Sequence, residues 1–368
     1  MKAGWYWDAA ATGFPKPTCV VQAVDEAMRR CGNPGRGGHA PARAAAEILW
    51  DARNTAAAFL GIDDPTRIVF TAGCTASLNT VIHGLPAGRA VVSDHEHNAV
   101  MRPLRAAGWQ ITAVDTGNTD EQALDGFERA LQTGADLVIC THASNVTGRA
   151  FPVADIAQLC RRRGVPFCLD AAQSAGTLPL PKADFLCIPG HKGFYGPMGT
   201  GILAVGEGMA PLPLMQGGTG VLSRLAGMPE DYPERLEAGT PNVAGIAGLA
   251  AGIDLVRRLT PDAIHRRETA ALLPVRRALL SHPDVTVYEG GRPQDAAVLS
   301  FSVKDRAASS VAALLESAGI AVRSGLHCAP AAHDAIHSPE DGTVRLSPNL
   351  WATPPDGEKI AKLLLQNL

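Results

Sequence analysis

Residues 136–170 decide the fold, with DLVIC at 136–140, DIAQLCRRRG at 155–164 and PFCLD at 166–170. The first and last segments are apolar runs with the length of a buried strand, and the middle segment has the length of a helix. A strand, a helix and a second strand in this order predict a βαβ unit with parallel strands.

The same alternation continues on both sides of this unit. Further apolar runs are RIVF at 67–70, RAVVS at 89–93, QITAV at 110–114, DFLCI at 184–188 and TGILAV at 200–205. A helical segment, EQALDGFERALQTG at 121–134, separates two of the runs. We therefore predict an α/β fold with a mostly parallel sheet, in which ligands bind at the carboxyl ends of the strands.

The pattern changes after about residue 250. Helical segments at 244–259 and 261–280 precede strand-like segments at 285–290 and 297–303 and a helix at 307–319. We predict a large domain at 15–250 and a smaller α+β domain formed by 1–14 and 251–368.

Composition narrows the class of protein. The chain has 368 residues, 46% hydrophobic and 19% charged, which is typical of a soluble globular protein. A net charge of −3 argues against nucleic-acid binding, and there is no apolar run long enough to predict a membrane span or a signal peptide. The eight cysteines include no C-x-x-C pair. We expect a cytoplasmic protein with no metal site, nucleic-acid partner or membrane contact.

Polar residues follow the apolar runs. They are a helix start at Cys74 and Thr75, then His97, Asn145, Asp170 with Gln173, and finally His191 and Lys192 between glycines. Singly, each has a plain structural reading: Thr75 or Asp170 can cap a helix, and Lys192 can be a solvated loop residue. Two histidines and two acids at 94–97 also leave a metal site open, although no further ligand cluster supports one.

As a set, these residues match the needs of pyridoxal 5'-phosphate (PLP). The phosphate of PLP binds at a helix N-terminus, its pyridine nitrogen pairs with a carboxylate, and its aldehyde bonds to a lysine. The order of the predicted residues along the chain supplies all three.

Segments spread over nearly the whole chain carry a resemblance to a known family. They are YWDAAATGFPKP at 6–17, GNPGRGGH at 32–39, EHNAVMRPL at 96–104, SNVTG at 144–148, DAAQSAG at 170–176, GHKGFYGP at 190–197, GTPN at 239–242, RSGLHCAP at 323–330 and TVRLSPN at 343–349. On these segments the chain resembles fold type I PLP enzymes of the class V aminotransferase family, and within them the cysteine desulfurases and selenocysteine lyases. The last two segments resemble the subgroup whose catalytic cysteine lies in an R-x-G-x-H-C-A loop.

The resemblance implies a role for each matching residue. Lys192 would bond to PLP and move the Cα proton, His97 would stack on the ring and assist proton transfer, and Cys328 would attack the substrate sulfur. Asp170 would pair with the pyridine nitrogen and Gln173 with the ring hydroxyl. Cys74, Thr75 and His191 would hold the phosphate, which Gly239 and Thr240 would reach from a second subunit. Arg345 would clamp the substrate carboxylate, with Asn145 beside it.

The implied activity converts L-cysteine to L-alanine with a persulfide on Cys328, in a homodimer with shared active sites that passes sulfur to an acceptor protein. A selenocysteine lyase, another class V reaction such as transamination or a different C–S cleavage, and a non-catalytic protein on the same fold are the alternatives. Cys328 could also be a small apolar residue in a tight loop. The adjacent His327 receives no role as its base, because neighbouring side chains on an extended loop often point apart.

The chain departs from the family pattern at three positions. Ala9, Ala76 and Pro189 stand where the family usually has asparagine, glutamate and a serine or threonine. We expect these changes to weaken PLP binding without changing the chemistry.

Overall fold

A seven-stranded sheet forms the centre of the computed structural model, which describes residues 4–35 and 37–368. The strands lie in the order β2-β8-β7-β6-β5-β3-β4. They are β2 (Ile68–Thr71), β3 (Arg89–Ser93), β4 (Gln110–Val114), β5 (Leu137–Thr141), β6 (Phe167–Asp170), β7 (Phe185–Pro189) and β8 (Gly201–Val205). Each apolar run identified between residues 67 and 205 forms one of these strands. β8 is antiparallel to β2 and β7 and the other neighbours are parallel, which confirms the predicted α/β fold.

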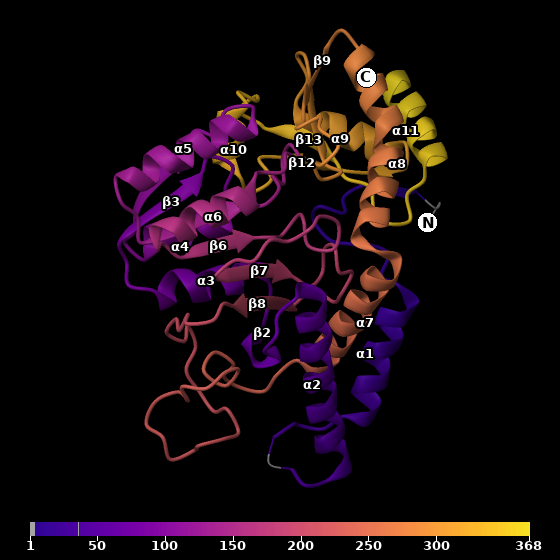
Figure 1. The fold of residues 1–368 in the computed structure, drawn as a ribbon. Helices are drawn as coiled ribbons and strands as arrows, with labels where there is room; N and C mark the ends of the chain where they lie inside the picture. The colour runs from indigo at the N-terminus through magenta and orange to yellow at the C-terminus, as the bar shows by residue number, and fades with distance from the viewer. Residues whose placement is uncertain (1–3, 36) are drawn as a thin grey trace.

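Helices cover both faces of this sheet. Successive strand residues point to opposite sides, and the apolar side chains on each side need a helix to bury them. In β5, Val138 belongs to the apolar core on one face, whereas Leu137 and Ile139 belong to the core on the other. The first core is shared with α2 (Ala40–Leu60), α5 (Asp120–Gln132), α6 (Val153–Arg163) and α7 (Val243–Leu259), and the second with α3 (Cys74–Gly84) and α4 (Asn98–Ala106). α1 (Thr18–Arg30) packs along α7 (Figure 1).

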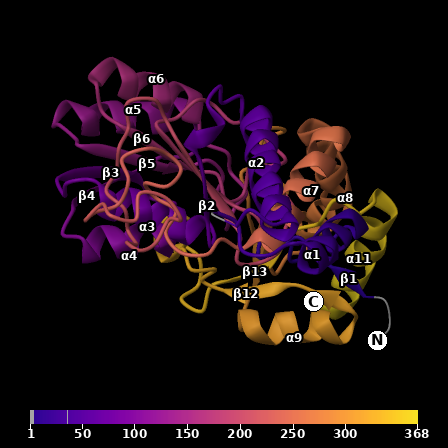
Figure 2. The same cartoon turned by 90° about the horizontal axis from the view of Figure 1, so that it is seen from below.

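A second, antiparallel sheet has the strand order β12-β13-β10-β9. Its strands are β9 (Val285–Tyr288), β10 (Leu299–Val303), β12 (Arg323–Gly325) and β13 (Thr343–Leu346). The helices of this part are α8 (Pro261–Ser281), α9 (Ala308–Ser317), α10 (Pro330–Ala335) and α11 (Pro354–Asn367). α11 packs along α8 (Figure 1), and α9 lies along β12 and β13 (Figure 2).

The N-terminal segment belongs to this second part of the molecule. β1 (Trp5–Tyr6) pairs with β11 (Ile320–Ala321), and Trp7 is buried in a separate apolar core with Phe301 and Leu346. The separate core supports the division into 15–250 and 1–14 with 251–368, which stays a prediction. Within residues 4–35 and 37–368, no helix is long and apolar enough to cross a membrane.

Candidate active site

The carboxyl ends of the central strands bring three predicted residues into one environment. Asp170 is the last residue of β6 and is 2% exposed. His97 caps α4 just after β3, and its Nδ1 accepts from the Ala99 N–H at 3.0 Å. Burial lowers the pKa of His97, while the charge of Asp170 raises it and that of Lys192 lowers it. His97, Asp170 and Lys192 therefore lie near enough to act on one bound molecule.

The start of α3 lies against Asp170. Gly73, the N-cap residue, has a φ of 149°, a conformation that favours glycine. The Cys74 thiol donates to Asp170 Oδ1 at 3.4 Å, and burial raises the pKa of this thiol, so it stays protonated. Thr75 is exposed in the first turn, where backbone N–H groups have no partner within the helix. This placement suits the predicted phosphate site.

Lys192 lies on the loop after β7 and is half-buried. The loop packs closely on its neighbour: a Cβ at Gly193 would lie 2.0 Å from the carbonyl oxygen of Ala175. Burial lowers the pKa of Lys192, Asp170 raises it, and Arg345 lowers it. The lowered pKa increases the fraction of neutral amine, which is the form that bonds to an aldehyde.

His191 and Gln173 are bonded to the N-terminal segment. His191 Nδ1 lies 3.1 Å from Thr12 Oγ1, and the His191 carbonyl accepts from Lys16 Nζ at 3.0 Å. Gln173 Nε2 donates to the Ala10 carbonyl at 3.0 Å. Burial lowers the pKa of His191 to about 4, so its imidazole is neutral at pH 7. The contacts of these residues with a phosphate and a ring hydroxyl stay predictions.

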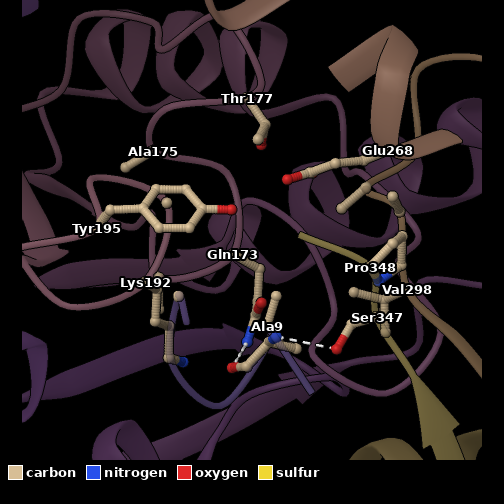
Figure 3. Close-up of a pocket in the computed structure, with 16 residues that line it drawn as sticks. Ala9, Gln173, Ala175, Thr177, Lys192, Tyr195, Glu268, Val298, Ser347 and Pro348 are labelled. Carbon is tan, nitrogen blue, oxygen red and sulfur yellow. Dashed lines mark hydrogen bonds between the residues drawn. The ribbon is translucent and has the colours of Figure 1, made fainter. Parts of the chain in front are cut away.

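A small cavity borders Lys192 (Figure 3). Its volume is about 40 Å³, which gives room for a few water molecules. Gln173 and Lys192 line it together with Ala9, one of the departures from the family pattern. Glu268 of α8 enters from another side and shares a hydrogen bond with Tyr195. Burial raises the pKa of Glu268 to about 8, so this carboxyl is neutral at pH 7.

Arg345, on β13, is 3% exposed and is held from two sides. Its Nη2 donates to Asp8 Oδ1 at 3.2 Å, and its Nη1 donates to the Asn145 carbonyl at 3.0 Å. Arg323, the cross-strand neighbour of Arg345, donates to both oxygens of Asp8 at 2.8–3.2 Å. Among the described residues, the buried Nε of Arg345 has no hydrogen-bond partner. This free N–H next to Nη2 suits the predicted bidentate contact with a carboxylate.

Cys328 is exposed on the loop after β12, whereas the other seven cysteines are buried or half-buried. His327 and Cys328 both have left-handed backbones, with φ of 49° and 57°. This conformation costs about 1–2 kcal/mol for each non-glycine residue, so the surroundings must hold the loop in place. Asn145 Nδ2 donates to the His327 carbonyl and the Asn98 N–H to the Cys328 carbonyl, each at 2.8 Å. The predicted residue Asn145 therefore lies beside the cysteine loop as well as beside Arg345.

The two histidines and two acids in the turn at 94–97, after β3, have separate partners and do not converge on one point. Glu96 is fully buried, and its Oε1 accepts from Ser93 Oγ at 2.6 Å and from the Thr141 N–H at 2.8 Å. His95 Nδ1 lies 3.2 Å from Ser144 Oγ. In the part of the chain that the structure describes, no three histidine, cysteine or acidic side chains are grouped as metal ligands.

Two predicted residues lie apart from this site. Gly239 and Thr240 are exposed, and the Gly239 N–H donates to the Gly218 carbonyl at 2.8 Å. His39, the last residue of the segment GNPGRGGH that carries the resemblance, caps α2 by accepting from the Ala42 N–H. Arg36 of the same segment lies outside the described residues.

The residues present fit PLP. A buried carboxylate lies at a strand end, a helix start lies beside it, and a lysine with a lowered pKa lies near both. These are the partners that a cationic pyridine nitrogen, a phosphate and an aldehyde need.

Comparisons with known proteins agree on the family. The sequence profile described as Aminotransferase class-V matches residues 5–356. A probable cysteine desulfurase of Xylella fastidiosa is 35% identical, over 88% of this chain and 82% of the relative. A probable cysteine desulfurase of Methanothermobacter thermautotrophicus is 35% identical, over 95% of this chain and 90% of the relative.

Solved structures give the same result. The apo structure of a cysteine desulfurase from Thermococcus onnurineus NA1 has a TM-score of 0.90 and 32% identity, covering 99% of this chain and 94% of that one. The cysteine desulfurase CsdA from Escherichia coli, in an S-sulfonic acid form, has a TM-score of 0.88 and 27% identity, with the same coverage. The fold and the site thus define an enzyme of the PLP-dependent type. The chain belongs to the class V aminotransferase family, in the group of the cysteine desulfurases.

Three buried acids at the site, Asp8, Glu96 and Glu268, have no role among the sequence-based predictions. Asp8 and Glu96 lie within the segments that carry the resemblance, but nothing in their spacing indicates their partners. Glu268 lies in the middle of a helical pattern with no distinguishing signal. The one available clue was the concentration of acids and histidines in the turn that contains Glu96.

Proposed function

We propose that the chain is a PLP-dependent cysteine desulfurase that converts L-cysteine to L-alanine and keeps the sulfur as a persulfide on Cys328. The observation that carries this proposal is the exposed thiol of Cys328, whose loop is bonded to Asn98 and Asn145. Asn98 follows His97 directly, and the Asn145 carbonyl binds Arg345, so the loop is fixed beside the residues proposed to hold substrate. The names of the relatives support the same substrate.

The substrate carboxylate would bind the free Nε and the Nη2 of Arg345. Bound PLP would supply an electron sink that acidifies the substrate Cα proton. Lys192 would accept that proton, since its lowered pKa makes the neutral amine available. His97 would be neutral with its ring proton on Nε2, because Nδ1 accepts from the Ala99 N–H.

The thiolate of Cys328 would then attack the substrate sulfur. An S–S bond forms, the substrate Cβ–Sγ bond breaks, and its electron pair stays on Cβ, which takes up a proton; Lys192 would return a proton to Cα to give alanine. Sulfur is oxidised to the persulfide level as Cβ is reduced, so the step needs no other oxidant. A thiol reductant or an acceptor protein would remove the sulfur.

The test compares alanine and sulfide release from L-cysteine, with a thiol reductant, in wild type and Cys328→Ala. Cys31→Ala serves as the control, because Cys31 is a half-buried thiol at the end of α1. We expect Cys328→Ala to lose turnover and to keep the absorption band of lysine-bound PLP, while the control keeps both. If Cys328→Ala turns over L-cysteine as fast as wild type, the proposed nucleophile is wrong, and selenocysteine and other class V substrates should be tested next.

We also propose a homodimer in which Gly239 and Thr240 reach the phosphate of the partner's site. Both residues are exposed, and they follow a segment with exposed apolar side chains, among them Leu212, Met215 and Leu222. Contiguous exposed apolar residues mark interaction surfaces. The eight free cysteines support a reducing, cytoplasmic compartment, where a sulfur-acceptor protein would meet Cys328. Light scattering would give the mass of the assembly.

A further inference from the structure

The side chains around Cys328 alternate between solvent and the interior. Leu326 and Cys328 are exposed, whereas His327 is 9% exposed and Ala329 is fully buried. The imidazole and the thiol of neighbouring residues therefore point in opposite directions. His327 does not face the thiol that follows it.

The buried imidazole of His327 contacts β13 of the second sheet. His327 Nε2 lies 3.2 Å from Oγ1 of Thr343, which is fully buried. Its ring packs at 5.6 Å from the ring of His333, measured between centroids. Thr343 begins β13, the strand that carries Arg345 two residues later. The bond therefore ties the cysteine loop to the strand of the proposed substrate clamp.

The left-handed backbone at His327 and Cys328 requires contacts that hold it in place, and the bond to Thr343 is one of them. Histidine and asparagine adopt this conformation more readily than most residues, and cysteine does so rarely. The Asn145 and Asn98 bonds hold the backbone from one side, and the imidazole holds it from the other.

We propose that His327 is a positioning residue, whose bond to Thr343 holds the Cys328 thiol at the substrate sulfur. His327 is not assigned a role as general base, because its buried side chain points away from the exposed thiol; burial, with Arg345 and His333 as neighbours, also lowers the pKa of His327 to about 2. The inference rests on the proposed function of Cys328 and adds the residue that positions its thiol.

The test uses variants that separate two effects: the bond from residue 327 to Thr343, and the tolerance of residue 327 for a left-handed backbone. His327→Gln puts an amide nitrogen near the position of Nε2, so it can keep the bond to Thr343. His327→Asn tolerates the left-handed backbone better, but its amide reaches only the position of Nδ1. Thr343→Val removes the hydroxyl and leaves His327 unchanged. Thr80→Val is the matched control, because the buried Thr80 hydroxyl donates to the Ala76 carbonyl within α3, its one hydrogen-bond partner among the described residues.

Two quantities are measured: kcat and KM for L-cysteine, and the rate at which iodoacetamide alkylates Cys328, followed by peptide mass spectrometry. We expect Thr343→Val and His327→Asn to lower kcat by about 10- to 100-fold with little change in KM, as for a misplaced reacting group. The same two variants should raise the alkylation rate, because a released loop exposes the thiol more often. His327→Gln and Thr80→Val should stay near wild type in both.

The proposal is overturned if Thr343→Val keeps the wild-type kcat, or if His327→Asn retains more activity than His327→Gln. The second result would mean that backbone tolerance matters and the bond does not. If Thr343→Val fails to fold, the comparison of His327→Gln with His327→Asn still decides. Alkylation needs no turnover, so it tests the placement of Cys328 even if Cys328→Ala remains active and the proposed function fails.

Discussion

Asp8 offers the sharpest prediction, because it is the only carboxylate bonded to Arg345 in the part of the chain that the structure describes. Asp8 is 7% exposed and Arg345 is 3% exposed, so Asp8→Ala would leave a buried guanidinium without its counter-charge. Removing one partner of a buried ion pair costs about 3–5 kcal/mol. With the unfolding entropy typical of a chain of 368 residues, that cost lowers the melting temperature by about 4–6 °C.

The same substitution should impair binding of the substrate carboxylate. Arg345 would lose the bond that orients Nη2 and its neighbouring Nε, and we expect KM for L-cysteine to rise by about tenfold or more. Steady-state kinetics and calorimetry measure the two effects, and Asp8→Asn should give an intermediate result because it keeps an acceptor oxygen. Asp262→Ala is the control, since it removes an exposed carboxylate that also pairs with an arginine, and it should change neither quantity measurably. A KM equal to or below that of wild type in Asp8→Ala would refute the reasoning, and a lower KM would mean that Asp8 competes with the substrate.

Three further predictions concern the surroundings of Lys192. Burial raises the pKa of Glu268 from 4.5 to about 8, so the folded chain keeps a proton that the unfolded chain releases, and stability should fall as the pH rises between these values. In urea unfolding at several pH values, Glu268→Gln should remove on the order of 5 kcal/mol of this decline, and an unchanged pH dependence would contradict the assignment. Gly193→Ala should destabilise the chain by about 1–3 kcal/mol and disturb the Lys192 loop, because its Cβ would lie 2.0 Å from the Ala175 carbonyl oxygen; a wild-type melting temperature would show that the loop can move. Lys192→Ala should abolish both turnover and the absorption band of lysine-bound PLP, and retention of that band would show that another amine holds the cofactor.

The central sheet could be predicted because each of its strands has a continuous apolar signal. A strand buried on both faces needs no alternation, so runs such as DLVIC and PFCLD stand out from the helices between them. The strand-end rule then placed His97, Asp170 and Lys192 together, since parallel strands deliver their carboxyl ends to one edge. This part of the site follows from local sequence and topology.

The remaining contacts depend on how the two sheets meet, which no local pattern encodes. Asp8 and Arg345 lie at opposite ends of the chain, and their bond depends on how the N-terminal segment, which pairs with β11 through β1, packs against the core of the second sheet. The direction of the His327 side chain depends on a left-handed backbone that periodicity does not predict. The bonds of His191 and Gln173 to Thr12 and Ala10 likewise depend on the path of the N-terminal segment.

Burial keeps several titratable groups around the site neutral, and this determines which charges act there. Glu96 and Glu268 hold their protons at pH 7 because burial raises the pKa of each to about 8, and His327 stays neutral because burial lowers its pKa. A neutral Glu96 does not add a second negative charge near Asp170, whose influence it feels. The charges that remain near a ligand include that of Asp170, suited to a cationic ring, and that of Arg345, suited to a carboxylate. A zwitterionic amino acid bound to a pyridinium cofactor requires that pattern, and an additional charge from either glutamate would oppose it.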